Sequence, residues 1–312
     1  GSASVRDLET LFQLIYLWFT QPRADREAFE TYQARMRDRI ETSQASPQTL
    51  FWERVRLLLA DGHYRAEPLT LEKVEQMDLE RSLAIYRDRF ADAGDFTFVF
   101  VGAVDPRELR ELAETYLGGL PVSGREEWWR DLDIDPPGGV VEDVVRRGIE
   151  PVSRVQFTFA GDFGWSRVEE FRLRALAGIL ETRLTRTLRE EIGGTYSVGV
   201  FSSTSKNPSG EYRFFVGFGC DPERVEELSA GVFAEIESIK RGELTAEEVA
   251  TQQEIMRRDL EVAREENSYW LRGIATALRR LEPPAELADS AALIENLRAE
   301  ALIEAARTFL LE

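Results

Sequence analysis

Metal-binding and redox-active side chains are scarce in this chain, which has one histidine and one cysteine among 312 residues. A single cysteine excludes an intrachain disulfide and leaves the redox compartment undetermined. Catalytic zinc usually takes three protein ligands and structural zinc four, with His and Cys prominent, so His63 and Cys220 cannot form such a site. Long apolar runs are also lacking, because the most apolar stretch, residues 11–19, is too short to span a bilayer. We therefore expect no metal site and no membrane insertion within this chain.

Basic side chains are outnumbered as well. Asp and Glu total 57 against 39 Lys and Arg, which gives a net charge of −18. A chain with this balance repels phosphate backbones, so nucleic acid is excluded as a partner. The hydrophobic content of 43% and aromatic content of 10% are typical of a globular protein, and the length suffices for two ordinary domains.

A hidden repeat supports two domains. Residues 26–42 match residues 246–262 when the sequence is shifted by 220 positions, and Gln33 and Met36 then coincide with Gln253 and Met256. Apolar and charged positions continue to coincide further along the chain. Duplicated units are the usual cause of such self-similarity. Residues 140–220 have no counterpart ahead of residue 1, so the first copy is expected to be truncated on its N-terminal side.

Periodicity predicts an α+β fold in which two homologous domains pack helices on a mixed β-sheet. The predicted helices are 5–20, 24–42, 46–61, 78–91, 106–117 and 166–190, followed by a helical run after residue 220. The predicted strands are 96–102, 140–147, 153–160, 196–203 and 211–219. We expect a truncated, mostly helical first domain over 1–118, a linker rich in Gly, Pro and charge over 119–139, and a second domain over 140–312 that lacks its last strand.

The stretch "LREEIGGTYSVGV" at residues 188–200 raises a functional question. A helix ends near Gly193, and a strand follows. This pattern fits an ordinary helix-to-strand connection. It also fits a turn that directs two hydrogen-bond donors, Arg189 and Tyr196, toward a common point. The spacing alone leaves both interpretations open, whereas Glu190 and Glu191 are expected to be solvated or salt-bridged.

Three stretches carry a resemblance to a known family: "LIYLWFTQPR" (14–23), "FVFVGAVDPRELRELAETYLGGLP" (98–121) and "LREEIGGTYSV" (188–198). They resemble the C-terminal half of the pitrilysin or insulin-degrading family of zinc peptidases, and especially the large single-chain bacterial members with four homologous domains. The resemblance implies that 1–118 and 140–312 are the third and fourth domains. It also implies that Arg189 and Tyr196 reach the zinc site and contact substrate and transition state.

The same resemblance implies the activity and its partners. The full-length protein would be a zinc metalloendopeptidase whose zinc is bound outside this chain by a His-x-x-Glu-His motif. This chain alone would be inactive, and its partners would be the N-terminal half of the same polypeptide and a peptide substrate. A periplasmic location is expected. The alternative is a non-catalytic peptide-binding or structural subunit of the same fold, in which the upstream motif would be missing.

Overall fold

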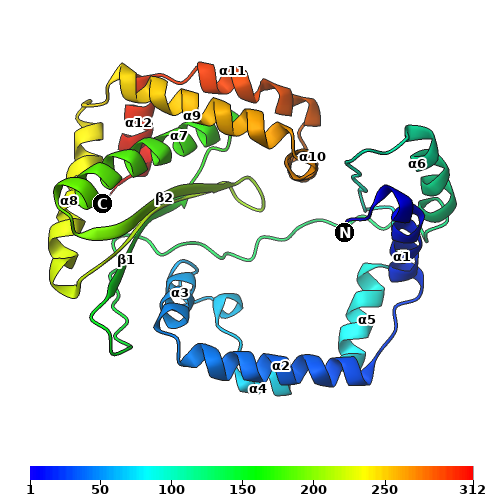
Figure 1. Cartoon of the computed structure of the whole chain (residues 1–312). Coiled ribbons are helices and arrows are strands. Elements are labelled where there is room, and N and C mark those ends of the chain that lie inside the picture. Colours follow the sequence, from blue (N-terminus) through cyan, green and yellow to red (C-terminus); the bar gives the residue numbers. More distant parts are fainter. Residues whose placement is uncertain (312) are drawn as a thin grey trace. The chain divides into compact units, whose positions relative to one another are not determined.

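The computed structural model describes residues 1–311, without the side chain of Tyr196. The chain divides into two compact units (Figure 1). The first unit comprises residues 1–58 and 62–130, and the second comprises 59–61 and 131–312. The main boundary therefore falls within the predicted linker 119–139.

The first unit is helical over its described residues. Its α-helices are α1 (Leu8–Thr20), α2 (Arg26–Gln44), α3 (Pro47–Leu58), α4 (Leu71–Glu75), α5 (Leu79–Arg89) and α6 (Pro106–Leu112). Its shorter turns are η1 (Val5–Asp7), η2 (Tyr64–Ala66) and the π-helical η3 (Ala113–Leu117). Asp25, Asp78 and Asp105 cap α2, α5 and α6 by accepting a backbone N–H of the first turn. These caps explain where the helices begin.

The segment predicted as strand 96–102 is not a strand in the structure. Its phenylalanines nevertheless pack on α1: Phe96 and Phe98 lie against Phe19, and Phe100 stacks on Phe12 at 4.9 Å between ring centroids. Alternate residues therefore contact the same helix. A strand needs a hydrogen-bonded neighbour, and no strand of the described chain pairs with this segment. Aromatic packing on α1 holds the segment, together with a backbone hydrogen bond from Phe96 N–H to the Ala93 carbonyl at 3.2 Å.

The second unit combines a small sheet with helices. Its strands are β1 (Ser153–Asp162), β2 (Thr195–Ser205) and β3 (Glu211–Cys220). Its helices are α7 (Arg167–Leu184), the π-helical η4 (Thr185–Glu191), η5 (Pro222–Arg224), α8 (Val225–Lys240), α9 (Ala246–Arg264), α10 (Asn267–Arg279), η6 (Pro284–Asp289), α11 (Ser290–Glu295) and α12 (Ala299–Phe309). The predicted α+β class is confirmed.

The sheet is antiparallel throughout rather than mixed, with strand order β1-β3-β2. Alternate residues of β3 are buried, from Tyr212 to Cys220. They form one core with the apolar side of α7 and α8, including Leu180 and Ile236. Figure 1 shows α7 and α9 on the same side of the sheet. The predicted strand 140–147 is absent: Val140 and Val144 are exposed, and no neighbouring strand pairs with this segment among the described residues.

The helices of the two units recur with one offset. Shifting α2 by 220 residues gives the bounds of α9, and the same shift takes α5 to α12 and α3 to within one residue of α10. One tertiary hydrogen bond also recurs. Gln33 Nε2 donates to the Val74 carbonyl at 3.0 Å, and Gln253 Nε2 donates to the Ile294 carbonyl at 2.9 Å. Sequence self-similarity thus corresponds to repeated structure.

Candidate functional site

The stretch 188–200 forms a tight reversal between helix and sheet. Ser166 caps α7, and a row of fully buried leucines anchors the helix in the core up to Leu188. The last turns widen into η4, whose bonds include Ile192 N–H to the Thr187 carbonyl at 3.0 Å. Such π-helical turns are often found at functional sites. The end is closed by Gly194 N–H, which donates to the Leu188 carbonyl at 3.0 Å.

The local geometry favours glycine at both positions of the reversal. Gly193 has φ of +69°, the left-handed conformation that ends many helices. Gly194 lies so close to α8 that an added Cβ would be 2.7 Å from Leu228 Cδ2 and 3.1 Å from Arg224 Cζ. A larger residue at Gly193 would be strained by the positive φ, and one at Gly194 would require the Leu228 and Arg224 side chains to shift.

Arg224 holds the turn from the start of α8. Its Nη2 donates to the Ile192 carbonyl at 3.3 Å. Its Nε and Nη2 also donate to Glu227 Oε2 at 3.0 and 2.8 Å, which orients the guanidinium. The carbonyl of Ile192, the residue after η4, is therefore tied to Arg224 of η5, the residue before α8.

The strand that follows begins with a β-bulge. Thr195 pairs with Cys220, but the next registered pair is Val198 with Phe218. Two residues of β2, Tyr196 and Ser197, therefore lie opposite the single residue Gly219. Bulges of this kind re-aim side chains and are frequent beside active sites. The bulge falls on the tyrosine that the sequence singles out.

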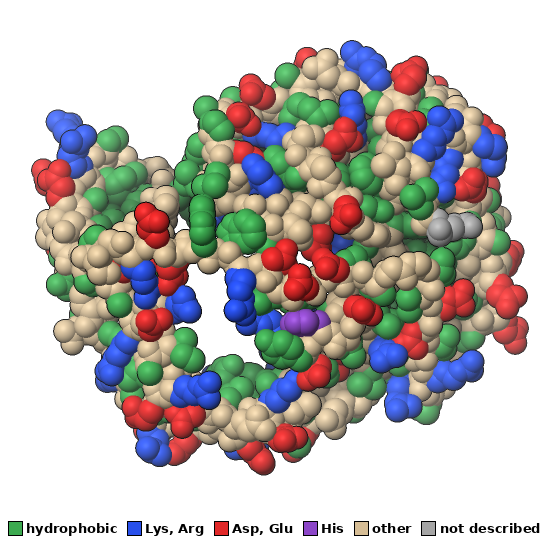
Figure 2. All heavy atoms as spheres, turned by 180° about the vertical axis from the view of Figure 1, so that it is seen from behind, with side chains coloured by type: hydrophobic (Ala, Val, Ile, Leu, Met, Phe, Trp, Pro, Cys, Tyr) green, Lys and Arg blue, Asp and Glu red, His purple; other side chains and the backbone are tan. Residues whose placement is uncertain are grey.

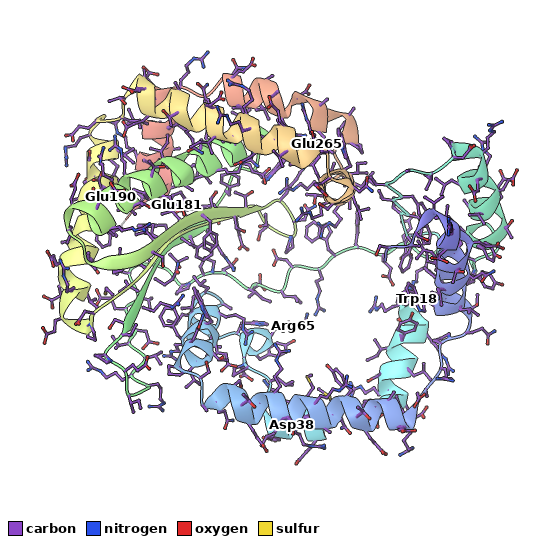
Figure 3. The ribbon with its side chains drawn as sticks, viewed as in Figure 1. Trp18, Asp38, Arg65, Glu181, Glu190 and Glu265 are labelled. Atoms are coloured by element: carbon purple, nitrogen blue, oxygen red, sulfur yellow. The ribbon has the colours of Figure 1, made fainter. Side chains whose placement is uncertain are left out.

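The two predicted site residues are described to different extents. Arg189 lies in η4 with an exposed side chain, and among the described residues it takes part in no hydrogen bond or ion pair. Tyr196 lies in β2, and its side chain is outside the part of the chain that the structure describes. Glu190 is exposed on η4 (Figure 3), and Glu191 lies 3.6 Å from Arg186 Nε. Both glutamates are solvent-facing, as expected.

The candidate metal ligands do not form a site. His63 Nδ1 accepts the backbone N–H of Arg65 at 3.2 Å, as the cap of a short turn in the first unit. Cys220 is buried in the core of the second unit, where burial raises the pKa of its thiol. Within residues 1–311, no group of three or more His, Cys, Asp or Glu side chains could hold a metal ion. These described residues therefore do not fit a zinc centre.

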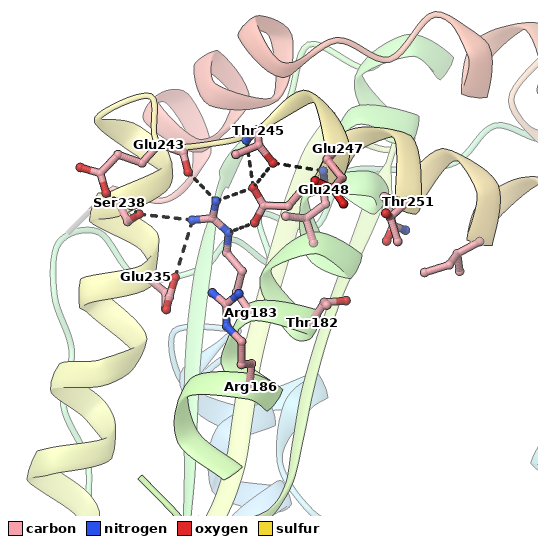
Figure 4. Close-up of a pocket in the computed structure, with 13 residues that line it drawn as sticks. Thr182, Arg183, Arg186, Glu235, Ser238, Glu243, Thr245, Glu247, Glu248 and Thr251 are labelled. Carbon is pink, nitrogen blue, oxygen red and sulfur yellow. Dashed lines mark hydrogen bonds and ion pairs between the residues drawn. The ribbon is translucent and has the colours of Figure 1, made fainter. Parts of the chain in front are cut away.

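A second feature is the groove around Arg183 (Figure 4). No local sequence pattern predicts it. It has a volume of about 650 Å³ and lies between α7, α8 and the start of α9. Arg183 is buried and donates to both carboxylate oxygens of Glu248, at 2.7 and 2.9 Å, and to Ser238 and the Glu243 carbonyl. The Arg183 guanidinium lowers the pKa of Glu248 to about 2.

Every nitrogen of the Arg183 side chain has a partner, so the groove offers no free donor there. Glu248 also forms the capping box of α9 with Thr245. Its Thr-x-x-Glu spacing is readable in the sequence as a helix start. Its second role, pairing with Arg183, depends on a contact 65 residues away. The cluster therefore joins α7 to α9.

The surface carries both signs of charge. Figure 2 shows acidic and basic side chains interspersed over one face of the molecule, without a continuous basic area on that face. No helix within residues 1–311 has the length and apolar character needed to cross a membrane.

Comparison with known proteins identifies relatives over nearly the whole chain. The family model described as "Peptidase M16 inactive domain" matches residues 77–256, more than half of the chain. The zinc protease PQQL-like protein of Arabidopsis thaliana is 28% identical over 315 residues, covering 94% of this chain and 32% of that protein. The probable zinc protease PqqL of Haemophilus influenzae is 26% identical over 233 residues, covering 73% of this chain and 24% of its own length.

A solved structure shares the fold. The periplasmic protease PqqL from Escherichia coli superposes with a TM-score of 0.83 at 22% identity, covering 99% of this chain and 34% of that protein. The present chain thus spans about a third or less of the length of these relatives.

Proposed function

The chain belongs to the peptidase M16 family through its inactive domain, and we propose that it is the C-terminal, non-zinc-binding part of a zinc metalloendopeptidase. Two observations support the proposal. The curated relatives are named zinc proteases and are about three times as long as this chain. The described residues contain no suitable set of metal ligands. Zinc and the N-terminal part of the polypeptide would complete the enzyme, and residues 1–312 alone would hydrolyse no peptide.

In the complete enzyme, Arg189 and Tyr196 contact the peptide substrate. Peptide-bond hydrolysis builds negative charge on the carbonyl oxygen, and donors held in place beforehand stabilise that charge most. A phenol hydroxyl supplies one hydrogen bond, and a guanidinium binds carbonyl groups through a planar fork. The observation that carries this role is the braced turn at 192–198, which leaves the Arg189 side chain exposed and without a partner among the described residues.

The proposed contact of Arg189 and Tyr196 with substrate also requires that this part of the protein close over the active site. Donors on this chain can reach a zinc centre bound elsewhere in the polypeptide only if the two parts come together around the substrate. The site would then exclude water, which strengthens each hydrogen bond to the reacting carbonyl.

The cellular location is proposed by analogy. The structural relative with the TM-score of 0.83 is described as a periplasmic protease. We place this protein in the periplasm as well. Detection of the full-length protein in periplasmic extracts, with a cytoplasmic enzyme as a leakage control, tests this location.

The experiment that tests the function uses the full-length protein. Tyr196→Phe removes one hydroxyl, and the loss of one such donor typically lowers kcat by about 10²–10³. Arg189→Ala is expected to raise KM as well, because it removes a binding fork. Arg258→Ala, at an exposed arginine of α9 that pairs with Glu254, is the matched control and should leave both constants unchanged.

Thermal melting separates chemistry from folding in these variants. Tyr196→Phe should melt within a degree or two of the wild type, because the change keeps the aromatic ring and removes a single oxygen atom. A variant with full activity, or one that loses activity only by unfolding, would assign the pair a structural role. Wild-type protein without zinc-dependent hydrolysis would instead favour the non-catalytic peptide-binding or structural subunit.

A further inference from the structure

Thr195 is the first residue of β2 and is only 8% exposed. Its Oγ1 lies 2.6 Å from the Gly219 carbonyl oxygen of β3 and accepts the backbone N–H of Ser197 at 3.3 Å. The Ser197 carbonyl, 3.0 Å away, is a second acceptor for the hydroxyl hydrogen. A threonine hydroxyl has one hydrogen and two lone pairs, so it can donate across the sheet and accept from Ser197 at once.

These contacts sit where the ladder between β2 and β3 is interrupted. A bulge leaves its extra residue out of the regular hydrogen-bond pattern, and the freed backbone groups need other partners. The Thr195 hydroxyl supplies partners on both strands. Tyr196 lies between the two β2 residues, Thr195 and Ser197, that this single hydroxyl connects.

Packing alone does not explain a threonine at this position. A buried hydroxyl is tolerated only when it is hydrogen-bonded, and valine has nearly the same shape and the same preference for strands. If Thr195 only filled space beside Cys220, valine would fill it equally well without a polar atom to satisfy. The hydroxyl is bonded to the bulge instead.

We propose that Thr195 is a positioning residue for Tyr196: its hydroxyl fixes the backbone of the bulge that carries the tyrosine. This inference rests on the proposed role of Tyr196 in peptide hydrolysis. Thr195 itself touches no substrate. A displacement of about 1 Å in a catalytic group can cost about 10²-fold in rate, so loosening the bulge should be measurable in kcat.

The first test measures kcat and KM of the full-length protein for peptide hydrolysis. Thr195→Val keeps the shape and removes the hydroxyl, and we expect kcat to fall about tenfold while KM changes little. Thr195→Ser restores the hydroxyl and should retain most of the activity. Thr204→Val is the matched control, because Thr204 lies on the same strand and its hydroxyl contacts Glu170 at 3.3 Å, away from the bulge.

A second measurement separates positioning from general structure. In the Tyr196→Phe background, Thr195→Val should cause no further loss of kcat, because Thr195 acts through the missing phenol. Hydrogen exchange of the Ser197 amide should be faster in Thr195→Val than in wild type or Thr195→Ser, whether or not zinc is bound. If the valine variant fails to fold, Thr195→Ala replaces it in both measurements.

The outcomes are distinguishable. Wild-type kcat in Thr195→Val, or an equal tenfold loss in the Tyr196→Phe background, would overturn the positioning role alone. Full activity of Tyr196→Phe would overturn the proposed function of the tyrosine, and with it the basis of this inference.

Discussion

The helices that recur in the two units are buried differently. Tyr32 of α2 is 50% exposed, whereas its counterpart Gln252 of α9 is buried beside α7. Ile85 of α5 is 55% exposed, whereas its counterpart Ala305 of α12 is 4% exposed in the core of the second unit. The first unit thus exposes large apolar side chains at positions where the second unit buries small or polar ones. Trp18 of α1 is a third large side chain of the first unit that is half exposed (Figure 3).

This difference in burial shows that the bounds of a helix and the burial of a helix have separate causes. The bounds of the helices follow from local sequence, because caps such as Asp25 and Thr245 occur at corresponding positions. Burial follows from what packs on the helix. In the second unit α7 and the sheet cover the equivalent face, and the described residues of the first unit include no sheet. The repeated sequence therefore sets where the helices begin and end. The elements that pack on each helix set how much of its surface is buried, and so how much the helix contributes to the stability of its unit.

A matched pair of methionines tests this comparison most directly. Met256 lies in a buried cluster with residues of α7, whereas its counterpart Met36 is only partly buried. Met256→Ala should destabilise the second unit by about 2–5 kcal/mol, because it leaves a cavity. Met36→Ala should cost the first unit less than about 1 kcal/mol.

Native-state hydrogen exchange measures the loss of stability in each unit separately, through the amides of α9 for Met256→Ala and of α2 for Met36→Ala. The gain in helix propensity from alanine is the same in both helices and cancels in the difference. Equal losses would show that the face of α2 is covered as well as that of α9.

The sequence predicts the helices well because their signals are local. The helix at 166–190 corresponds to α7 and η4, and Gly193 closes it with a positive φ. Residues 153–160, 196–203 and 211–219 form strands of nearly the predicted length. Residues 96–102 and 140–147 alternate in the same way but are not strands. Alternation states which face is apolar, and it does not supply the neighbouring strand that a sheet requires.

The site was predictable only in part. The spacing of Arg189, the glycines and Tyr196 pointed to the turn, but its supports did not appear in the pattern. Thr195 contacts Gly219 and Arg224 contacts Ile192, which are separations of 24 and 32 residues. Such contacts depend on how β2, β3 and α8 come together. A bulge is a property of paired strands, so one strand's sequence does not reveal it.

The ion pair between Arg183 and Glu248 offers a second contrast, because the position equivalent to Glu248 in the first unit is Ala28. The pKa of Glu248 is lowered to about 2, so its contribution to stability is complete above the ordinary carboxylate pKa of about 4.5. The contribution is lost as the pH falls from about 4.5 toward 2, where the folded protein takes up the proton. Acid should therefore weaken the second unit through this residue.

Glu248→Gln should cost the second unit about 1.5–3 kcal/mol at pH 7, the usual value of a hydrogen bond to a charged group. The difference from wild type should shrink to near zero at pH 2. Denaturant unfolding at a series of pH values, followed through exchange in α9, measures it. Ala28→Glu in α2 is the matched control and should add no such pH dependence. A pH-independent cost of Glu248→Gln would assign the effect to packing.

The smallest expected effect tests whether the repeat extends to tertiary hydrogen bonds. Gln33 and Gln253 each donate to a carbonyl 41 residues further along the chain, at 3.0 and 2.9 Å. Replacing either by alanine removes this neutral hydrogen bond, which is worth about 1 kcal/mol. At Gln253 it also removes weaker contacts of Nε2 with the Glu295 and Leu297 carbonyls, at 3.1 and 3.4 Å. Because the main bond is shared and the extra contacts belong to Gln253 alone, both variants should lose about 1 kcal/mol, with the larger loss at Gln253. Gln44→Ala, at an exposed position of α2, should change neither. A loss at Gln253 without one at Gln33 would mean that α2 and α4 are not held together as α9 and α11 are, and the repeat would then describe helix bounds but not their packing.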